Sequence, residues 1–483
     1  MNFKMMARFI ASILVLEAIF MLPALAISVF CNEPTAIRGF LYSLGVILVI
    51  VALLFLIWHN DEKDKGFYAR EGMICVGIGW IALGLLGALP FYLSGEIPLY
   101  IDAFFETVSG FTTTGASILN NVEALSHGLL YWRSFSHWVG GMGVLVFILA
   151  VLPPSGGFTM HILRAESPGP NVSKLVPRMR QTATILYLLY IALTVLCFIF
   201  LLIGRMPVFD AVCTAFGTAG TGGFGVKNDS IASYSPYLQN VCTVFMLLFG
   251  VNFSCYYLLL AKKFLDVFRD EELRLYFGVV LASVALISLN IRGFYSTMGE
   301  TVRHAAFQVA SIITTTGFAT TDFDLWPSFS KAILLCLMFL GACAGSTGGG
   351  LKCIRLLILL KDLRRNIRRV LRPNDVRVVK SNGQTMDEKI VASTNAYLSA
   401  YVVIIIVSFI LISLDGFSTA TNFSAVMACF NNIGPGFEAV GATCNYSGYS
   451  AFSKLVLIFD MLAGRLEIFP ILLLGSRATW RRV

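Results

Sequence analysis

The sequence predicts an all-α integral membrane protein in which ten transmembrane helices and four re-entrant half-helices take a pseudo-fourfold arrangement. Of its 483 residues, 57% are hydrophobic and only 13% are charged, and the mean hydropathy is +0.77. A soluble chain of this length needs more charge to cover its surface. A helix that crosses a bilayer needs roughly 20 apolar residues. Ten segments qualify, at about 9–30, 39–58, 72–94, 129–152, 183–204, 237–261, 276–293, 329–351, 394–414 and 453–474.

The first apolar segment has some features of a signal peptide. Lys4 and Arg8 precede it, and the sequence ALA at 24–26 is similar to a cleavage site. However, the apolar run from Phe9 to Phe30 is 22 residues long, and a second span follows at once. We therefore expect a retained first helix.

Basic residues lie mainly on one side of the predicted membrane. With the spans numbered alternately from a cytoplasmic N-terminus, the inner segments carry 27 of the 36 lysines and arginines. This bias predicts that both termini are cytoplasmic. The net charge of +8 then faces membrane lipids or a cytosolic partner, and no nucleic acid is expected. Of the eleven cysteines, Cys31 and Cys444 map to the outside, so a disulfide between them stays open.

One unit occurs four times along the chain, as a short helix-like run that ends in a polar, glycine-containing loop. Asp102, Asp210 and Asn422 begin three copies at the expected N-cap, and the third copy begins around Glu300 to His304. Ten helical residues reach only about 15 Å, half the apolar thickness of a bilayer. Each run must therefore enter and leave on the same face. The copies are DAFFETVSGFTTTGAS (102–117), DAVCTAFGTAGTGGFG (210–225), HAAFQVASIITTTGFAT (304–320) and NFSAVMACFNNIGPGF (422–437), with aligned glycines Gly115, Gly222, Gly317 and Gly434.

Each repeat crosses the membrane twice, so all four have the same orientation and can form a ring around an axis along the membrane normal. This differs from the inverted repeats of many secondary transporters. The predicted organisation is an N-terminal two-helix extension (1–60), repeat 1 (70–152), repeat 2 (182–262), repeat 3 (275–362), a basic cytoplasmic linker (363–391), repeat 4 (392–475) and a cytoplasmic tail (476–483).

The four loops are candidates for a cation site built from backbone carbonyl groups. Irregular backbone at membrane depth is tolerated only where protein or a water-filled cavity satisfies it, and rings of carbonyl oxygens can replace the hydration shell of a monovalent cation. The loop cores contain no carboxylate, which disfavours a divalent site. The half-helices also direct their partly negative C-terminal ends to the centre. A single TTTG would more simply be a turn or a packing feature, but four copies at matching offsets favour the ring.

Two other glycine patterns suggest no nucleotide site. Gly220, Gly222 and Gly225 fit GxGxxG, but no βαβ unit surrounds them. The run GSTGGGLK (345–352) lacks the GK[ST] ending of a P-loop. We therefore expect no ATP hydrolysis and no enzymatic activity.

These motifs resemble the TrkH/KtrB/HKT superfamily of potassium transporters, which carry four K⁺-channel-like repeats in one chain. The two additional N-terminal spans resemble the TrkH branch. The resemblance covers nearly all 483 residues. It implies a potassium uptake protein of the bacterial inner membrane that transports K⁺ and has no organic cofactor. Glycine in all four loops is similar to the potassium-selective members, whereas plant relatives that favour sodium carry serine in the first. The implied filter carbonyls belong to Thr113, Thr114, Gly115, Gly220, Thr221, Gly222, Thr315, Thr316, Gly317, Asn432, Ile433 and Gly434.

The resemblance also implies an intramembrane gate. GACAGSTGGG (341–350) interrupts the last span of repeat 3, and five glycines in ten residues cannot make a rigid helix. Close helix packing through small residues is the alternative. Arg465 lies within the last span. The resemblance implies that it narrows the permeation pathway, as the matching arginine does in the family, and a structural ion pair is the alternative. The implied gate residues are Gly345, Ser346, Thr347, Gly348, Gly349, Gly350, Lys352 and Arg465.

The segment 352–389 carries 11 basic and 4 acidic residues. It is either a solvated loop that contacts lipid headgroups or the docking surface for a cytosolic nucleotide-binding ring of the TrkA type, and the resemblance also implies a homodimer. Two other functions stay open. A symporter coupled to H⁺ or Na⁺ would need titratable groups near the midplane, for which Glu17, Glu106 and Arg465 are the candidates. A structural or receptor subunit with a degenerate filter would not conduct.

Overall fold

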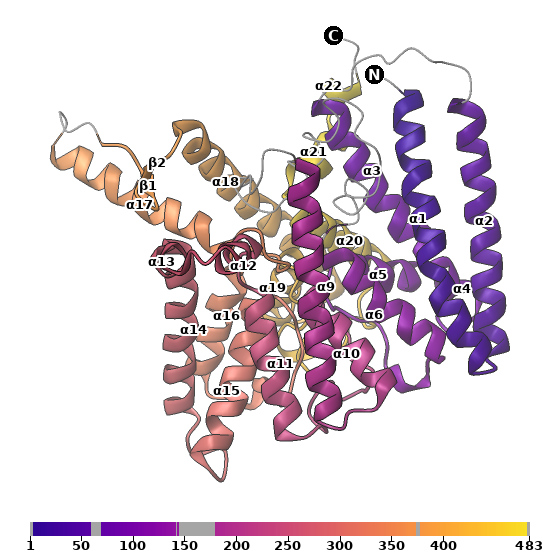
Figure 1. Cartoon of the computed structure of the whole chain (residues 1–483), viewed down its shortest axis with the longest axis horizontal. Coiled ribbons are helices and arrows are strands. Elements are labelled where there is room, and N and C mark those ends of the chain that lie inside the picture. The colour runs from indigo at the N-terminus through magenta and orange to yellow at the C-terminus, as the bar shows by residue number, and fades with distance from the viewer. Residues whose placement is uncertain (1–2, 59–68, 142, 144–178, 373–376, 481–483) are drawn as a thin grey trace.

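The computed structural model describes residues 3–58, 69–141, 143, 179–372 and 377–480, and regular structure in these ranges is almost entirely helical. Two long helices, α1 (Phe3–Phe30) and α2 (Pro34–Trp58), come first. They lie side by side at one edge of the molecule (Figure 1). The turn between them lies at the end of the molecule opposite both termini (Figure 1).

The remainder of the chain repeats one pattern, in which a long helix precedes a short helix, a loop and a second helix. The long helices are α3 (Ala69–Gly87), α9 (Met179–Ile203), α14 (Glu271–Asn290) and α18 (Glu388–Ile412). The short helices are α5 (Tyr100–Phe111), α10 (Val208–Gly220), α15 (Met298–Ile313) and α19 (Thr419–Phe430). The second helices are α6 (His127–Gly141), α11 (Pro236–Phe249), α16 (Ser328–Phe339) and α20 (Ala451–Arg465).

The remaining helices lie between or after these elements. They are α4 (Leu89–Leu93), α12 (Phe253–Leu260), α13 (Phe264–Arg269), α17 (Cys353–Leu371), α21 (Phe469–Gly475) and α22 (Arg477–Trp480). Single 3₁₀ turns are η1 (Val122–Ala124), η2 (Phe323–Leu325), η3 (Ser413–Asp415) and η4 (Glu438–Val440). Strands β1 (Lys380–Ser381) and β2 (Gln384–Thr385) pair antiparallel, with Lys380 opposite Thr385.

Among the described residues, six helical segments are long and apolar enough to cross a membrane. They are Phe3–Phe30, Pro34–Leu56, Arg70–Leu93, Thr184–Ile203, Glu271–Asn290 and Glu388–Asp415. The second helices are shorter than the predicted spans, and in repeat 3 the break agrees with the interruption that the sequence predicts at 341–350. α11 and α12 bend by 89° at a short break. A loop interrupts the predicted span 329–351 after Phe339, and 453–474 breaks after Arg465. The end of the span 129–152 lies outside the described residues.

Glycines explain where these second helices end. Gly464 lies next to the Phe430 carbonyl at the end of α19, and Gly140 lies next to the Phe111 carbonyl at the end of α5. A Cβ atom at either position would lie closer than 3.0 Å to that backbone, which real Cβ atoms essentially never do. Glycine permits this approach but weakens a helix. The short helices are consequently held at the centre, and every residue of α5 from Ala103 to Phe111 is buried.

Candidate functional site

The short helices begin one turn earlier than the sequence predicts. Asp102, Asp210 and Asn422 are not N-caps but lie in the first turns of α5, α10 and α19. Ser418 caps α19 by accepting a hydrogen bond from the Thr421 backbone N–H (3.1 Å). Acidic residues in the first turn still stabilise a helix through its macrodipole.

The four loops that follow the short helices share one backbone conformation. In each, a residue with φ between 53° and 56° is followed two positions later by a glycine with φ between 78° and 96°. These left-handed values are costly for residues with a Cβ atom and easy for glycine. The pairs are Thr113 with Gly115, Thr221 with Gly223, Thr315 with Gly317, and Asn432 with Gly434. We call these segments the glycine loops (112–115, 220–223, 314–317 and 431–434).

This correspondence shifts the alignment of the second glycine loop by one residue. The equivalent of Gly115 is Gly223, whereas the sequence alignment uses Gly222. Gly220 is the last residue of α10 and lies against the carbonyl group of His137, so it corresponds to Thr112 and not to Thr113. The physical reason is that only Gly223 has the left-handed φ, of 80°, that the other loop glycines share.

The glycine loops contact one another in cyclic order. The left-handed glycine of each loop faces a carbonyl oxygen of the next loop so closely that an added Cβ atom would lie less than 3.0 Å from it. The fourth loop closes on the first, so the four form a ring. The contacts join Gly115 to the oxygen of Gly222, Gly223 to that of Thr316, Gly317 to that of Ile433, and Gly434 to that of Thr114.

Four carbonyl oxygens in this ring have no hydrogen-bond partner within the described part of the chain. They belong to Thr114, Gly222, Thr316 and Ile433. More than about 90% of buried carbonyl groups in native proteins are paired. Four unpaired buried carbonyls in one ring are therefore unusual, and oxygens of this kind can act as ligands for a cation.

Several side chains of the glycine loops form hydrogen bonds within or between the loops. The Thr112 and Thr114 hydroxyls are 2.8 Å apart, and those of Thr314 and Thr316 are 2.7 Å apart. In the fourth loop, the Asn432 amide donates to the Thr114 hydroxyl at 2.9 Å. Asn432 therefore ties the fourth loop to the first, although it replaces a threonine.

A buried ion pair supports the first two glycine loops. Glu106 on α5 accepts from Arg133 Nε at 2.5 Å and from the Ile118 backbone N–H at 3.0 Å. Arg133 also donates to the Gly225 carbonyl at 3.0 Å and lies over the Phe224 ring. The side chains of Glu106 and Arg133 are 0% and 3% exposed, so neither charge is solvated. No sequence motif marks Arg133, although an arginine within a predicted span is a signal in itself.

His137 on α6 provides a second link between these loops. Its Nδ1 lies 2.7 Å from the Gly110 carbonyl oxygen, which makes Nδ1 the donor. Its Nε2 then accepts from the Phe224 backbone N–H at 3.2 Å. Burial and these two bonds fix one neutral tautomer. The sequence alone gives no reason to select this histidine.

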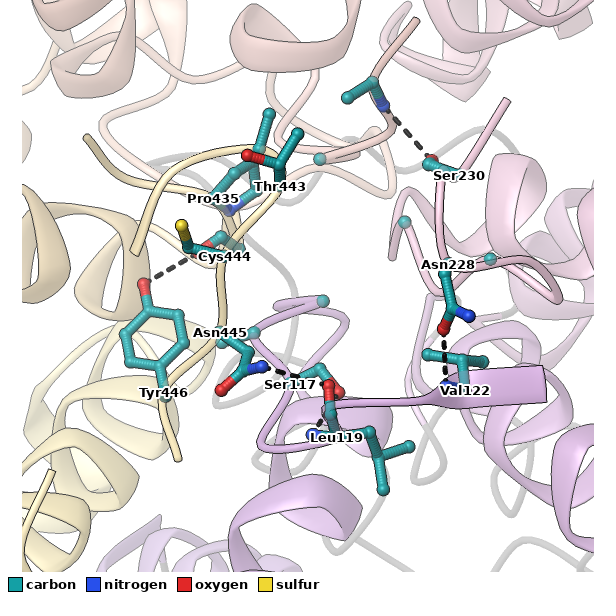
Figure 2. A pocket seen from close by; sticks show the side chains of 18 of the residues that line it. Ser117, Leu119, Val122, Asn228, Ser230, Pro435, Thr443, Cys444, Asn445 and Tyr446 are labelled. Carbon is teal, nitrogen blue, oxygen red and sulfur yellow. Dashed lines mark hydrogen bonds between the residues drawn. The ribbon is translucent and has the colours of Figure 1, made fainter. Parts of the chain in front are cut away.

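A cavity of about 180 Å³ lies above the ring and is lined by the left-handed glycines of all four loops. Asn228 Oδ1 accepts from the Val122 backbone N–H at 2.7 Å, and Asn445 Nδ2 donates to the Leu119 carbonyl at 3.2 Å. Figure 2 shows these side chains around the opening, with Ser117 and Leu119 from the first repeat opposite Pro435 and Thr443 from the fourth. The cavity is therefore a mouth to which all four repeats contribute.

On the other side of the ring, the segment 340–352 folds across the ends of α15 and α19. Leu340 and Leu351 form a parallel bridge that closes it into a loop. The Gly349 N–H donates to Thr315 Oγ1 at 2.7 Å. A Cβ atom on Gly349 would lie 2.6 Å from the Asn431 carbonyl oxygen. This segment, here called the gate loop, therefore contacts the third and fourth glycine loops directly.

Two cationic side chains hold the gate loop. Arg465 donates to the carbonyls of Thr347 (2.9 Å), Gly141 (2.9 Å) and Gly140. Lys352 is buried, and its Nζ donates to the Gly348 carbonyl. Arg465 thus joins the gate loop to the end of α6.

Two carboxylates support the ends of the gate loop. Glu272 accepts from the backbone N–H groups of Ala344 (2.7 Å) and Ile354 (2.9 Å). Glu467 forms an ion pair with Arg355 at the start of α17. Its partner is therefore Arg355 and not Arg465. Sequence spacing does not predict either contact, because the partners are distant along the chain.

The three titratable residues that the sequence offers for H⁺ or Na⁺ coupling lie in different environments. Glu17 on α1 is 1% exposed, and neither carboxylate oxygen has a hydrogen-bond partner among the residues that the structure describes. Glu106 is paired with Arg133, and Arg465 binds the gate loop. Two of the three residues therefore make polar contacts with the surrounding protein, and Glu17 is the one without a hydrogen bond in the described residues.

Comparisons with known proteins agree with this geometry. The family model described as "TrkH: Cation transport protein" matches residues 42–480. The chain is 38% identical over 489 positions to the Trk system potassium uptake protein TrkH of Escherichia coli K12, covering all of both chains. It is 32% identical to TrkG of the same organism, with 96% of each chain covered. The crystal structure of the potassium transporter TrkH from Vibrio parahaemolyticus matches all of both chains at 30% identity, with a TM-score of 0.86.

Proposed function

The chain belongs to the TrkH family of cation transport proteins, and from this premise we propose that it takes up potassium ions through a channel-like pore with a carbonyl selectivity filter. The relatives are named potassium uptake proteins, and none of the names describes an enzyme. We therefore assign transport and no catalytic reaction to this chain.

The closed ring of unpaired carbonyls carries the proposal. A dehydrated monovalent cation needs several oxygen ligands at once, and a ring of backbone carbonyls supplies them without a charged side chain. The C-terminal ends of four short helices add negative potential at the same place. The proposed filter residues are Thr113, Thr114, Gly115, Thr221, Gly222, Gly223, Thr315, Thr316, Gly317, Asn432, Ile433 and Gly434.

The proposed architecture follows from the same ring. The short helices α5, α10, α15 and α19 are the re-entrant pore helices, and each repeat contributes one quarter of the pore. We retain the domain boundaries 1–60, 70–152, 182–262, 275–362, 363–391, 392–475 and 476–483. Ten spans result if each interrupted second helix counts as one crossing.

We also propose that the gate loop blocks the pore beneath the filter. Its contacts with Thr315 and with the end of α19, in two of the four repeats, support this position. Arg465 and Lys352 hold it there through carbonyl groups, which can be released without breaking a covalent or ionic bond. Opening requires this loop to leave the axis.

The gate loop continues directly into α17, which offers a route for regulation. Helix α17 and the β1–β2 pair project from the body of the molecule (Figure 1). A cavity there is lined by Lys361, Arg364, Arg365, Arg368, Arg377 and Lys380. We propose this basic surface as the docking site of a cytosolic nucleotide-binding ring of the TrkA type. A homodimer in the bacterial inner membrane, with both termini cytoplasmic, completes the proposal.

Uptake of radioactive Rb⁺ into proteoliposomes tests the function. We expect uptake that follows the Rb⁺ gradient and the membrane potential, is inhibited by K⁺, and does not respond to an imposed pH gradient at fixed potential. No uptake by correctly folded protein would contradict the proposal.

Proton-coupled symport is the second candidate, and Glu17 is the observation that favours it. A buried intramembrane carboxyl without a hydrogen-bond partner can bind a proton. A symporter would accumulate Rb⁺ when only a pH gradient is imposed, and Glu17→Gln would remove that accumulation. Passive permeation predicts no accumulation in either protein.

A further inference from the structure

Three metal-ligating side chains gather on the surface far from the gate loop. Cys31 and Glu33 come from the turn between α1 and α2, and His127 begins α6. One ligand atom from each residue lies within 4.8 Å of the other two. The turn lies at the end of the molecule opposite both termini (Figure 1), which is the outer side in the proposed topology.

Local structure fixes two of the three ligands before any ion binds. Asn32, between Cys31 and Glu33, has a φ of 56°, and this left-handed turn directs its two neighbours toward α6. Glu33 accepts from the backbone N–H groups of His127 (2.7 Å) and Gly128 (3.1 Å). Its Oε1 also lies 2.9 Å from His127 Nδ1. Carboxylates that bind metals are commonly held by such hydrogen bonds.

Close packing of two helices fixes the distance between the ligands. A Cβ atom on Gly128 would lie 2.9 Å from the Ala24 carbonyl oxygen of α1, and it would also clash with Ser28. The end of α1 and the start of α6 are therefore packed in direct contact, which brings the three ligands near one another. Cys31, which is a free and exposed thiol, and His127, whose side chain is 56% exposed, remain accessible from outside.

From this cluster we propose that Cys31, Glu33 and His127 form a binding site for zinc on the external face. A thiolate, an imidazole and a carboxylate are the ligand types that Zn²⁺ prefers, and water completes a tetrahedral site. Neighbouring ligand atoms around tetrahedral zinc lie about 3.3–3.6 Å apart. The three ligand atoms lie within 4.8 Å of one another, and the two ligands that would adjust to an ion, Cys31 and His127, are exposed. The site is independent of the proposed pore, and it ties the N-terminal helix pair to repeat 1.

Zinc titration of the full-length protein in nanodiscs, after treatment with a chelator, tests the site. Competition with a chromophoric chelator should show one zinc ion per chain. Cys31→Ser and His127→Gln should each weaken binding at least tenfold, whereas a hard cation such as Mg²⁺ should not compete. Cys444→Ser is the matched control, because Cys444 is also a free, exposed cysteine. Equal zinc affinity in all three variants would overturn the proposal.

A labelling experiment checks the site without depending on the affinity of the variants. A membrane-impermeant maleimide should modify Cys31 from outside, and saturating zinc should slow this reaction at least tenfold because the bound thiolate is no longer available. The rate at Cys444 should not change. An unchanged rate at Cys31 would contradict the site. Retained Rb⁺ uptake by the variants shows that they are folded.

Discussion

The substitution Gly115→Ser tests the ring most sharply. Gly115 has a φ of 78°, and a Cβ atom there would lie less than 3.0 Å from the Gly222 carbonyl oxygen, where ordinary contacts are 3.4–4 Å. The left-handed backbone costs a non-glycine residue roughly 1–2 kcal/mol. The neighbouring loop must also move outward, which widens the ring that distinguishes one cation from another.

A loss of about 1–2 kcal/mol in discrimination corresponds to a factor of roughly 5–30. We therefore expect the K⁺ over Na⁺ selectivity ratio to fall by about one order of magnitude, measured as competition of each ion with Rb⁺ uptake in proteoliposomes. Gly278→Ser is the control, because nothing lies within 4 Å of a Cβ atom at that position. An unchanged ratio in folded Gly115→Ser protein would refute the assignment of the filter.

Three further substitutions test the contacts around the filter. Arg465→Ala removes the charge-assisted hydrogen bond to the Thr347 carbonyl of the gate loop, worth about 1.5–3 kcal/mol, and should raise Rb⁺ flux without a regulator several-fold. Flat flux would refute the gate. Glu272→Ala should raise flux in the same assay. Glu271→Ala is the control and should leave flux unchanged, because Glu271 binds Lys361 instead of the gate loop. Arg133→Ala leaves Glu106 buried without its cation and should lower the free energy of unfolding by about 3–5 kcal/mol. If the ion pair explains this loss, the double variant Arg133→Ala/Glu106→Gln should recover part of the stability.

The repeat and its glycine loops were accessible from the sequence because they depend on local patterns. A helix of about ten residues that ends in glycine is recognisable in each copy, and comparison of the four copies makes the ring evident. The apolar segments follow from composition in the same way. The structure accordingly shows the short helices and left-handed loop glycines in all four repeats.

The register of the second glycine loop was not accessible in this way. Its sequence GTGG offers two adjacent glycines, and only the backbone conformation distinguishes Gly223 from Gly222. The partners of Glu106 and Glu272 are distant in sequence, so spacing cannot reveal them. Outside repeat 3, whose interruption the sequence predicts, the breaks in the second helices likewise depend on which backbone packs against each glycine, and that is a property of the assembled fold.

The position of the permeating ion tests the central claim most directly. Crystals of the protein grown in Rb⁺ should give anomalous scattering peaks on the axis of the ring, coordinated by the carbonyl oxygens of Thr114, Gly222, Thr316 and Ile433. Rubidium peaks confined to sites away from these four oxygens would contradict the account, and the pathway for cations would then have to be sought elsewhere in the molecule.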